Sequence, residues 1–340
     1  MLRPTLAAIA VLRPTLAAIA VLLAPSALAA EPLPVGTCIN MGNHLEPERE
    51  SGWGGKRVEA ADFARIRAAG FDTVRIPVRW MNKSDPKPPH ALDPAWLARV
   101  GEVVDRALAA DLNVSLNSHH FDAGHRDPAA GAPWLAAVWR QIAARFADRP
   151  SARLWFEIEN EPHDRLDNAN LVATLAPALA AIRASSPDRP VVIGGGNWSG
   201  IDSLATLELP DDANVHPTFH YYEPFDFTHQ GASWAGPVPR AHSRDYGTRA
   251  DAERLAADVA KLRAYVARTG RTPFMGETGA YDGGTSLAER IEYHTAVREA
   301  FTPAGIGICA WAYTNTFPFW DRGRERWLPG LRAAVGLPED

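Results

Sequence analysis

The sequence predicts an α/β protein with a single domain folded as a (β/α)8 TIM barrel. From residue 36 onward, eight short apolar segments of strand-like composition alternate with amphipathic segments that have the periodicity of helices. Their number and length match a barrel in which each parallel strand is followed by a helix. A doubly wound open sheet is the rival fold. No Gly-x-Gly-x-x-Gly pattern follows the first strand, so a dinucleotide-binding fold has no support.

The expected strands are short and rich in β-branched and aromatic residues, and they lie at 36–42, 73–78, 113–118, 153–159, 190–195, 214–220, 272–277 and 305–313. Helices are expected between them at 58–70, 93–111, 132–148, 168–186, 249–270 and 286–302, with a short fifth crossover near 200–208. Asp93 with Pro94 is typical of a helix start, and Gly70 of a helix end. No change of composition marks a second domain, so we expect residues 31–340 to form one barrel.

The first 30 residues are predicted to be a secretory signal peptide with an internal duplication. The segment LRPTLAAIAV occurs at residues 2–11 and again, unchanged, at 12–21. The second copy and its flank combine a basic residue, an apolar run and small residues before a cleavage site. A membrane anchor is the alternative, but Arg13 and Pro14 interrupt the apolar run. We therefore expect a secreted protein, extracellular or periplasmic, that does not span a membrane in its mature form.

The composition argues against nucleic acid as a partner and leaves open whether the two cysteines form a disulfide. The net charge of -5 argues against nucleic-acid binding, which favours a basic surface. The 11 tryptophans fit either core packing or flat platforms for sugar rings. Cys38 and Cys309 are the two cysteines, and an exported protein could join them, but two buried free thiols fit equally well. We expect a monomer.

Polar and aromatic residues lie where nearly every expected strand ends, the edge at which such barrels carry their functional groups. They are Asn43, His44, Glu46, Arg75, His119, His120, Asn160, Glu161, Asn197, Trp198, His220, Tyr222, Glu277 and Trp311. Glu161 and Glu277 are the acids at the strand tips, on the fourth and seventh strands. Two carboxyls in different protonation states are what the cleavage of a glycosidic bond requires.

The segment WFEIENEP places Glu157, Glu159 and Glu161 at alternate positions. In a regular strand, these three side chains would share one face at successive depths, and Glu161 alone would reach the catalytic end. Because unpaired buried carboxylates are costly, we expect at least one of the other two to be paired, protonated or turned outward. Asn160 and Glu161 can both approach a substrate only if the strand ends in a bulge or stops abruptly at about Asn160.

The strand-end motifs GTCINMGN, RIPVRW, LNSHH, FEIENEP, HYY, GET and AWAY, in this order across residues 36–313, resemble those of glycoside hydrolase family 5. The resemblance implies a retaining mechanism with carboxyls about 5–5.5 Å apart. In it, Glu161 is the general acid/base and Glu277 the nucleophile. Arg75 holds Glu277 ionised, Tyr222 donates a hydrogen bond to Glu277, and His220 tunes Glu161.

The same resemblance implies contacts with the sugar. Asn160 would bind the 2-hydroxyl of the reacting sugar, and His119 would bind hydroxyls or fix Asn160. Trp311 would form the floor beside the scissile bond, with a cis peptide to Ala312. Further substrate contacts are expected from His120, Asn43, Glu46, Trp198 and Trp234, with Trp53 near the mouth of the barrel.

The opening INMGNHLE resembles the endo-acting cellulase branch, so endo-1,4-β-glucanase is the expected activity. β-Mannanase, xyloglucanase or another β-glucanase are alternatives that use the same scaffold. A non-catalytic sugar-binding barrel and a metal-dependent amidohydrolase are more distant ones. Tyr313 stands where many cellulases have an acidic residue two positions after the tryptophan.

Two other segments could suggest ligands. Residues 119–127, HHFDAGHRD, contain three histidines and two aspartates, but their spacing matches no zinc signature. We expect a loop of solvated and substrate-facing polar groups there, and neither a metal nor a cofactor in the protein. Residues 281–286, YDGGTS, are read as the N-terminal turn of a helix and not as a phosphate-binding loop.

Overall fold

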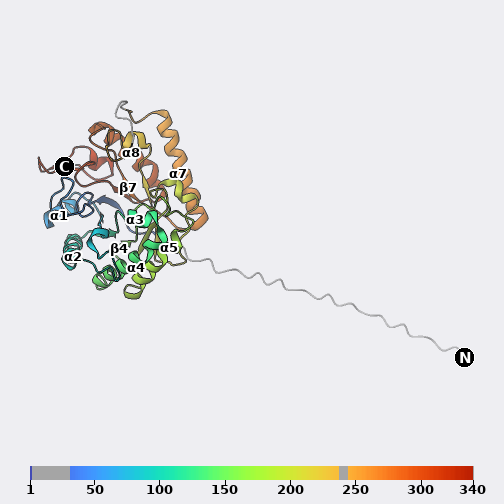
Figure 1. Ribbon diagram of the computed structural model, residues 1–340. Helices are drawn as coiled ribbons and strands as arrows, with labels where there is room; N and C mark the ends of the chain where they lie inside the picture. Colours follow the sequence, from blue (N-terminus) through green and yellow to red (C-terminus); the bar gives the residue numbers. More distant parts are fainter. Residues whose placement is uncertain (2–30, 237–243, 340) are drawn as a thin grey trace.

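Eight parallel strands close into a barrel in the computed structural model, with helices around it (Figure 1). The structure describes residue 1, residues 31–236 and residues 244–339. Each strand pairs with the next in chain order, and β8 (Ile308–Ala310) returns to pair with β1 (Thr37–Asn40). The predicted TIM barrel is confirmed, and the open-sheet alternative is wrong because no strand of the barrel is left at an edge.

All eight strands of the barrel overlap the segments predicted as strands. Between β1 and β8 lie β2 (Thr73–Ile76), β3 (Asn113–Asn117), β4 (Leu154–Glu157), β5 (Val191–Gly194), β6 (Val215–Tyr221) and β7 (Phe274–Thr278). Six of the surrounding helices also lie where the periodicity predicted them: α1 (Ala60–Ala68), α2 (Pro94–Ala109), α4 (Pro128–Arg145), α5 (Leu171–Ser185), α7 (Arg249–Thr269) and α8 (Leu287–Phe301). The fifth crossover is the short helix η2 (Ile201–Ala205), as expected.

Several short elements were not predicted, because one or two turns are too short to show a period. They are η1 (Met81–Lys83), α3 (Asp122–Arg126), α6 (Phe225–Thr228), η3 (Thr302–Ala304), the pair β9 (Trp320–Asp321) and β10 (Arg326–Trp327), and α9 (Leu331–Ala334). Of these, α3 and α6 follow β3 and β6 at the catalytic end of the barrel, so they bear on the site.

Local chemistry explains where the main helices begin. The Asp93 carboxylate accepts hydrogen bonds from the first free backbone N–H groups of α2, and Pro94 occupies the first helical position. Ser286 and Glu289 form a reciprocal capping box at the start of α8. The reading of residues 281–286 as a helix N-terminal turn is therefore confirmed.

Cys38 and Cys309 form a disulfide that joins the first and last strands of the barrel. The two residues face each other in register on β1 and β8, and both are buried. Around them packs a small apolar cluster that includes Val35, Trp155 and Phe274. Of the two arrangements left open by the sequence, the structure has the bonded one.

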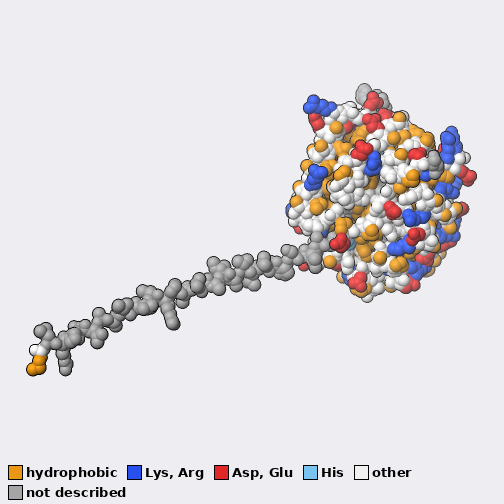
Figure 2. Space-filling view, turned by 180° about the vertical axis from the view of Figure 1, so that it is seen from behind, with side chains coloured by type: hydrophobic (Ala, Val, Ile, Leu, Met, Phe, Trp, Pro, Cys, Tyr) orange, Lys and Arg blue, Asp and Glu red, His pale blue; other side chains and the backbone are white. Residues whose placement is uncertain are grey.

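The predicted signal peptide, residues 1–30, lies outside the described residues apart from Met1. Among the helices that the structure describes, none has the length and apolar character needed to cross a bilayer. Figure 2 shows basic and acidic side chains interspersed on one face of the molecule, with no continuous basic stripe there. The expectation that the protein does not bind nucleic acid stays a prediction.

Candidate active site

The end of β4 positions two polar residues side by side. The strand stops at Glu157, and the backbone N–H of Asn160 then bonds to the carbonyl of Ser118 at 2.9 Å. Glu161 adopts a positive φ of 49°, which is uncommon for a residue with a side chain. The predicted abrupt strand end is confirmed, although it falls three residues earlier than expected.

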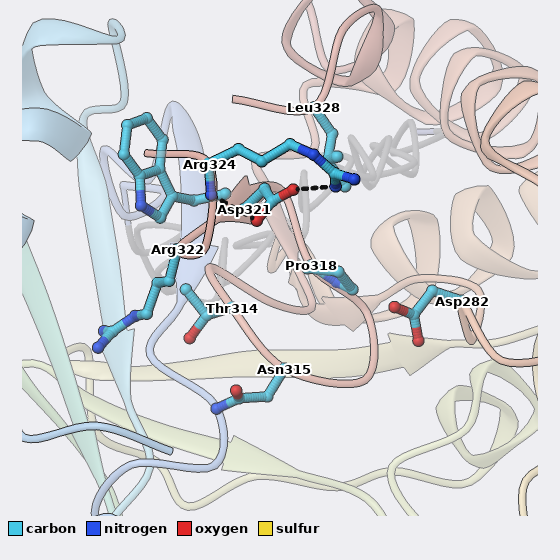
Figure 3. Close-up of a pocket in the computed structure, with 9 residues that line it drawn as sticks. Asp282, Thr314, Asn315, Pro318, Asp321, Arg322, Arg324 and Leu328 are labelled. Carbon is cyan, nitrogen blue, oxygen red and sulfur yellow. Dashed lines mark hydrogen bonds and ion pairs between the residues drawn. The ribbon is translucent and has the colours of Figure 1, made fainter. Parts of the chain in front are cut away.

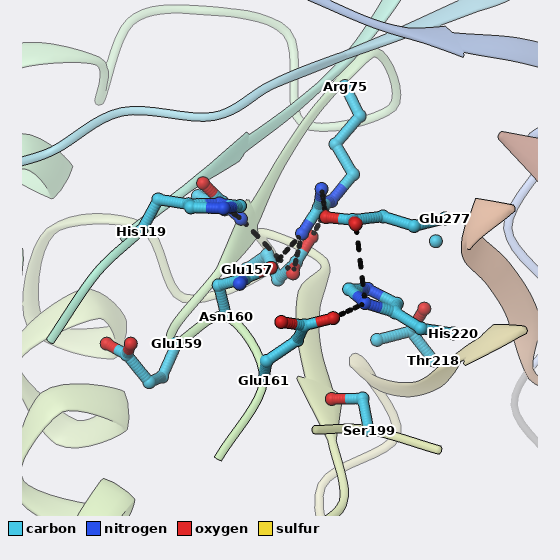
Figure 4. A network of polar contacts seen from close by, with 12 residues as sticks. Arg75, His119, Glu157, Glu159, Asn160, Glu161, Ser199, Thr218, His220 and Glu277 are labelled. Atoms are coloured by element: carbon cyan, nitrogen blue, oxygen red, sulfur yellow. Dashed lines mark hydrogen bonds and ion pairs between the residues drawn. The ribbon is translucent and has the colours of Figure 1, made fainter. Parts of the chain in front are cut away.

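Arg75 lies at the centre of the polar network below the barrel mouth (Figure 4). It is fully buried, and all five of its N–H groups donate hydrogen bonds. Two go to the carboxylate of Glu157, at 2.7 Å each, and one goes to Glu277 at 2.6 Å. The other two go to the side-chain oxygens of Asn40 and Asn160, at 2.9 and 2.6 Å. One guanidinium thus fixes residues from β1, β4 and β7 relative to one another.

The three glutamates of the fourth strand do not share one face, so that expectation was wrong. The alternation stops with the strand, and Figure 4 shows Glu159 turned away from the Arg75 network. Burial alone would raise the pKa of Glu157, but Arg75 holds it below its usual value. Burial raises the pKa of Glu159 well above its usual value. The expectation that at least one of the two would be paired, protonated or turned outward is confirmed by the ion pair of Glu157 with Arg75.

Glu161 and Glu277 both point toward the same ring nitrogen of His220 (Figure 4). One oxygen of each carboxylate and one ring nitrogen of His220 all lie within 4.8 Å of one another. His220 Nδ1 is 2.7 Å from Glu161 Oε1 and 3.7 Å from Glu277 Oε2. Such a separation of the acids agrees with the short distance of retaining glycosidases.

Burial shifts the pKa values of Glu161, His220 and Glu277. Burial raises the pKa of Glu161 to about 7, so it carries a proton over much of the acidic and neutral range. Burial lowers the pKa of His220 to about 4, so its ring is neutral there. Burial also raises the pKa of Glu277, and the charge of Arg75 opposes that rise. The Tyr222 hydroxyl donates a hydrogen bond to Glu277 Oε2 at 2.9 Å, which also favours the ionised form.

Trp311 and His119 form the wall next to the acids. The Trp311–Ala312 peptide bond is cis, at the position expected from the sequence. The His119 ring lies nearly parallel to Trp311, 18° between planes and 6.0 Å between centroids. His119 Nδ1 contacts Asn117 at 3.2 Å, and no direct bond to Asn160 is among the contacts of the described residues.

Exposed aromatic rings surround the mouth of the barrel. Trp198 is 51% exposed and stacks on His163, with 9° between the ring planes. Trp234 is 55% exposed and meets Tyr281 edge-on. Trp53, half exposed, meets the ring of His120 edge-on. Phe225 on α6 is exposed as well, and sequence reasoning missed it because the short helix gave no pattern.

The first loop differs in part from expectation. The side chain of Asn43 donates to the Thr316 hydroxyl at 3.1 Å. Glu46 is fully buried, and its carboxylate accepts the backbone N–H groups of Asn43 and His44. It therefore braces the loop from below and does not face a substrate, which corrects the expected contact. Tyr313 is also buried, so it makes no sugar contact in place of the missing acid.

Residues 119–127 are not the solvated loop that the sequence suggested. His119 and His125 are buried, and Asp122–Arg126 forms the helix α3. Phe121 packs against both His125 and Trp134, which draws this segment inward.

A separate pocket of about 390 Å³ lies over the loops that follow β7 and β8 (Figure 3). Asp282, Asn315 and Arg322 are among its lining residues, whereas Glu161 and Glu277 are not. Glu161 is partly exposed and Glu277 is buried, so the pair meets solvent mainly through Glu161.

The chain was compared with known families and proteins. A family model described as cellulase (glycosyl hydrolase family 5) matches residues 36–317. Endoglucanase H of Acetivibrio thermocellus is 33% identical over 279 residues, which are 82% of this chain and 29% of that relative. The chain therefore spans less than a third of the relative's length.

Solved structures give longer matches. An endoglucanase chain superimposes with a TM-score of 0.85 at 36% identity, covering 89% of this chain and 97% of the other. Cel5A of Thermotoga maritima, solved with mannotriose and with cellobiose, gives a TM-score of 0.85 at 33% identity, covering 88% of this chain and 97% of that chain. The similarity thus includes the whole barrel.

Proposed function

Because the chain belongs to the cellulase family, glycosyl hydrolase family 5, we propose that it is a retaining endo-1,4-β-glucanase. The observation that supports this proposal most is the short distance between the carboxyl groups of Glu161 and Glu277. One oxygen of each carboxyl lies within 4.8 Å of one oxygen of the other. Burial raises the pKa of Glu161 to about 7, whereas the hydrogen bonds that Arg75 and Tyr222 donate to Glu277 favour its ionised form. That combination is what double displacement at an anomeric carbon needs.

In the first step, Glu277 attacks the anomeric carbon. A carbon–oxygen bond to Glu277 forms while the glycosidic bond breaks, and the proton of Glu161 moves to the departing oxygen. Arg75 and Tyr222 hold the attacking carboxylate in place through its two oxygens. Because Arg75 also fixes the side-chain oxygen of Asn160, the amide nitrogen of Asn160 stays free to donate to the sugar 2-hydroxyl.

In the second step, water replaces the departed sugar. Glu161, now ionised, takes a proton from the water, whose oxygen attacks the anomeric carbon and displaces Glu277. His220 Nδ1 faces Glu161 Oε1 at 2.7 Å, so this ring can keep a hydrogen bond to the carboxyl as it loses and regains a proton. Two inversions at one carbon leave the configuration retained.

The exposed rings support action inside a long chain. Trp53, Trp198 and Trp234 offer flat apolar faces on different loops, and sugar rings stack on such faces. A β-1,4-linked glucan fits this arrangement. β-Mannanase is the second candidate, because the similar Cel5A has been solved with mannotriose as well as with cellobiose.

The test is hydrolysis of carboxymethyl cellulose, glucomannan, pure mannan and xyloglucan by the purified protein. We expect cleavage of the glucan with a rapid fall in viscosity relative to the release of reducing ends. Preferential cleavage of mannan would support the second candidate. Binding to these polymers without any hydrolysis would instead point to a sugar-binding barrel.

We also propose that residues 1–30 direct export and that the mature protein works outside the cytoplasm as a monomer. N-terminal sequencing of protein recovered from the culture fluid or periplasm should begin close to residue 31. Protein that stays in the cytoplasm with residues 1–30 attached would overturn this.

A further inference from the structure

A second cluster of ligand-type side chains lies next to the candidate active site. Asp122 and His125 are on α3, and His163 follows β4. One atom from each, a carboxylate oxygen and two ring nitrogens, lies within 4.8 Å of the others. His125 Nδ1 and His163 Nε2 are 3.3 Å apart. Tetrahedral zinc with Zn–N bonds of about 2.0–2.1 Å places two ligand nitrogens roughly 3.3–3.4 Å apart.

The other nitrogen of each ring already has the partner that a metal-bound histidine needs. His163 Nδ1 is 2.6 Å from the backbone carbonyl of Glu161, so it carries the proton and leaves Nε2 with a lone pair. His125 Nε2 is 3.2 Å from the carboxyl of Glu159. Histidine ligands usually donate their second N–H to a carbonyl or a carboxylate in this way.

Glu159 is the observation that sets this cluster apart from an ordinary surface group. Its side chain is fully buried and faces His125 Nε2 at 3.2 Å. A carboxyl behind the imidazole, on the side away from the other two side chains, is the arrangement that orients a metal-bound histidine.

We propose that Asp122, His125 and His163 bind a divalent transition-metal ion, with Zn²⁺ the ion that their nitrogen and oxygen ligands fit best. The fourth position would be taken by water, since Asp122 is exposed. In the bound state, the neutral ring of His125 carries its proton on Nε2, facing Glu159, so that Nδ1 offers its lone pair to the metal.

The site would connect α3 to the segment that carries Glu161. His163 stacks beneath the exposed ring of Trp198 and bonds to the carbonyl of Glu161 itself. A bound ion would therefore fix both a sugar platform and the backbone of the acid/base. The segment 119–127 alone showed no zinc spacing, because the third ligand is 38 residues from His125 in the sequence.

The first experiment titrates Zn²⁺ into chelator-stripped protein, without substrate, by calorimetry. Metal content after gel filtration and the thermal midpoint are measured on the same samples. We expect one ion per chain and a midpoint that rises with zinc concentration. Because no turnover is involved, the result does not depend on the hydrolase activity proposed above.

Variants identify the ligands. Asp122 is exposed, so the Asp122→Asn variant should fold normally. Its affinity for zinc should nevertheless fall by at least tenfold, and we expect the same of His163→Gln. Glu159→Gln, which removes only the outer partner of His125, should weaken binding about 10–100-fold. Asp188→Asn removes an equal charge from an exposed position outside the cluster and should bind as the wild type does.

Two outcomes would overturn the proposal. One is the absence of stoichiometric binding by the wild-type protein at micromolar zinc. The other is unchanged affinity in both Asp122→Asn and His163→Gln with loss in Glu277→Gln, which would place the ion among Glu161, His220 and Glu277. Cobalt substitution separates these sites further, since the visible spectrum of a bound Co²⁺ should change in His163→Gln and not in Glu277→Gln.

Discussion

Arg75 and Glu157 form a buried, two-pronged ion pair beneath the candidate catalytic acids, with 2.7 Å between donor and acceptor on each prong. Glu157 adds nothing to the chemistry directly. It holds the guanidinium plane so that the remaining N–H groups point at Glu277, Asn160 and Asn40. The position of Glu277, the proposed nucleophile, therefore depends on an acid that is one layer further down the barrel.

Replacing Arg75 by lysine should be strongly disruptive although the charge is kept. An ammonium group cannot form two parallel bonds in one plane, so Glu157 would stay buried with an incomplete partner. We expect a loss of about 3–5 kcal/mol in the free energy of unfolding, measured with chemical denaturant. Arg249→Lys is the control, because its pair with Glu253 is exposed and should change stability by less than about 1 kcal/mol. Equal midpoints for the two variants would contradict the central role of Arg75.

Glu161→Gln should retain the fold and lose most of its activity on polysaccharides. The amide cannot protonate the departing oxygen, so kcat/KM should fall about 10²–10⁴-fold. An aryl glycoside with an acidic leaving group does not need that proton, so the formation of the glycosyl-enzyme from it should fall much less. Stopped-flow release of the aryl group measures this step. Equal losses on both substrates would argue against Glu161 as the general acid.

The pH profile of kcat/KM should be bell-shaped. Glu161 must be protonated for the first step, and burial raises its pKa to about 7, so activity should fall as the pH rises through that value. Glu277 must be ionised, and its pKa is raised by burial, so activity should fall again at acidic pH, on a limb lying above the usual range of a glutamate. The residual activity of Glu161→Gln should lack the basic limb. A basic limb that persists in this variant would assign it to another group.

Sequence periodicity was enough to predict the barrel because each of its eight strands and six long helices buries a stretch of several apolar residues. The same logic placed Glu161 and Glu277 at strand ends. It could not place Glu159, since the alternation of a strand holds only while the strand lasts, and β4 ends two residues earlier. Where backbone geometry changes, the direction of a side chain is decided by its tertiary surroundings.

Contacts between segments that are distant in the sequence also could not be predicted from the sequence. Glu46 looked like a substrate ligand because it follows the first strand, yet the loop folds back and places its carboxylate against backbone N–H groups. His163 gave no signal by itself, and its relation to His125 appears only when α3 and the end of β4 meet. Such pairs cannot be seen from spacing along one segment.

The disulfide should contribute to stability and not to catalysis. Cys38 and Cys309 lie 271 residues apart, so the bond closes almost the whole barrel in the unfolded chain. Cys38→Ala with Cys309→Ala should lower the free energy of unfolding by about 2–5 kcal/mol. The thermal midpoint of the wild type should fall on adding a reductant, and that of the double variant should not. Activity well below the melting range should stay near the wild-type level in both cases.

Glu277 should become covalently labelled by a 2-fluoro glycoside that carries a good leaving group. Fluorine at carbon 2 destabilises the positively charged transition states of both steps, while the leaving group restores the first step, so the glycosyl-enzyme accumulates. Peptide mass mapping should find the added sugar on Glu277, because its carboxylate is the one held by Arg75 and Tyr222.

Glu277→Gln provides the control for this labelling, since it should fold, take up no label and show no measurable turnover. Glu161→Gln should still be labelled, and its adduct should persist longer, because the base that activates the incoming water is missing. A label on Glu161, or a product of inverted configuration by NMR, would reverse or remove the roles assigned to the two acids.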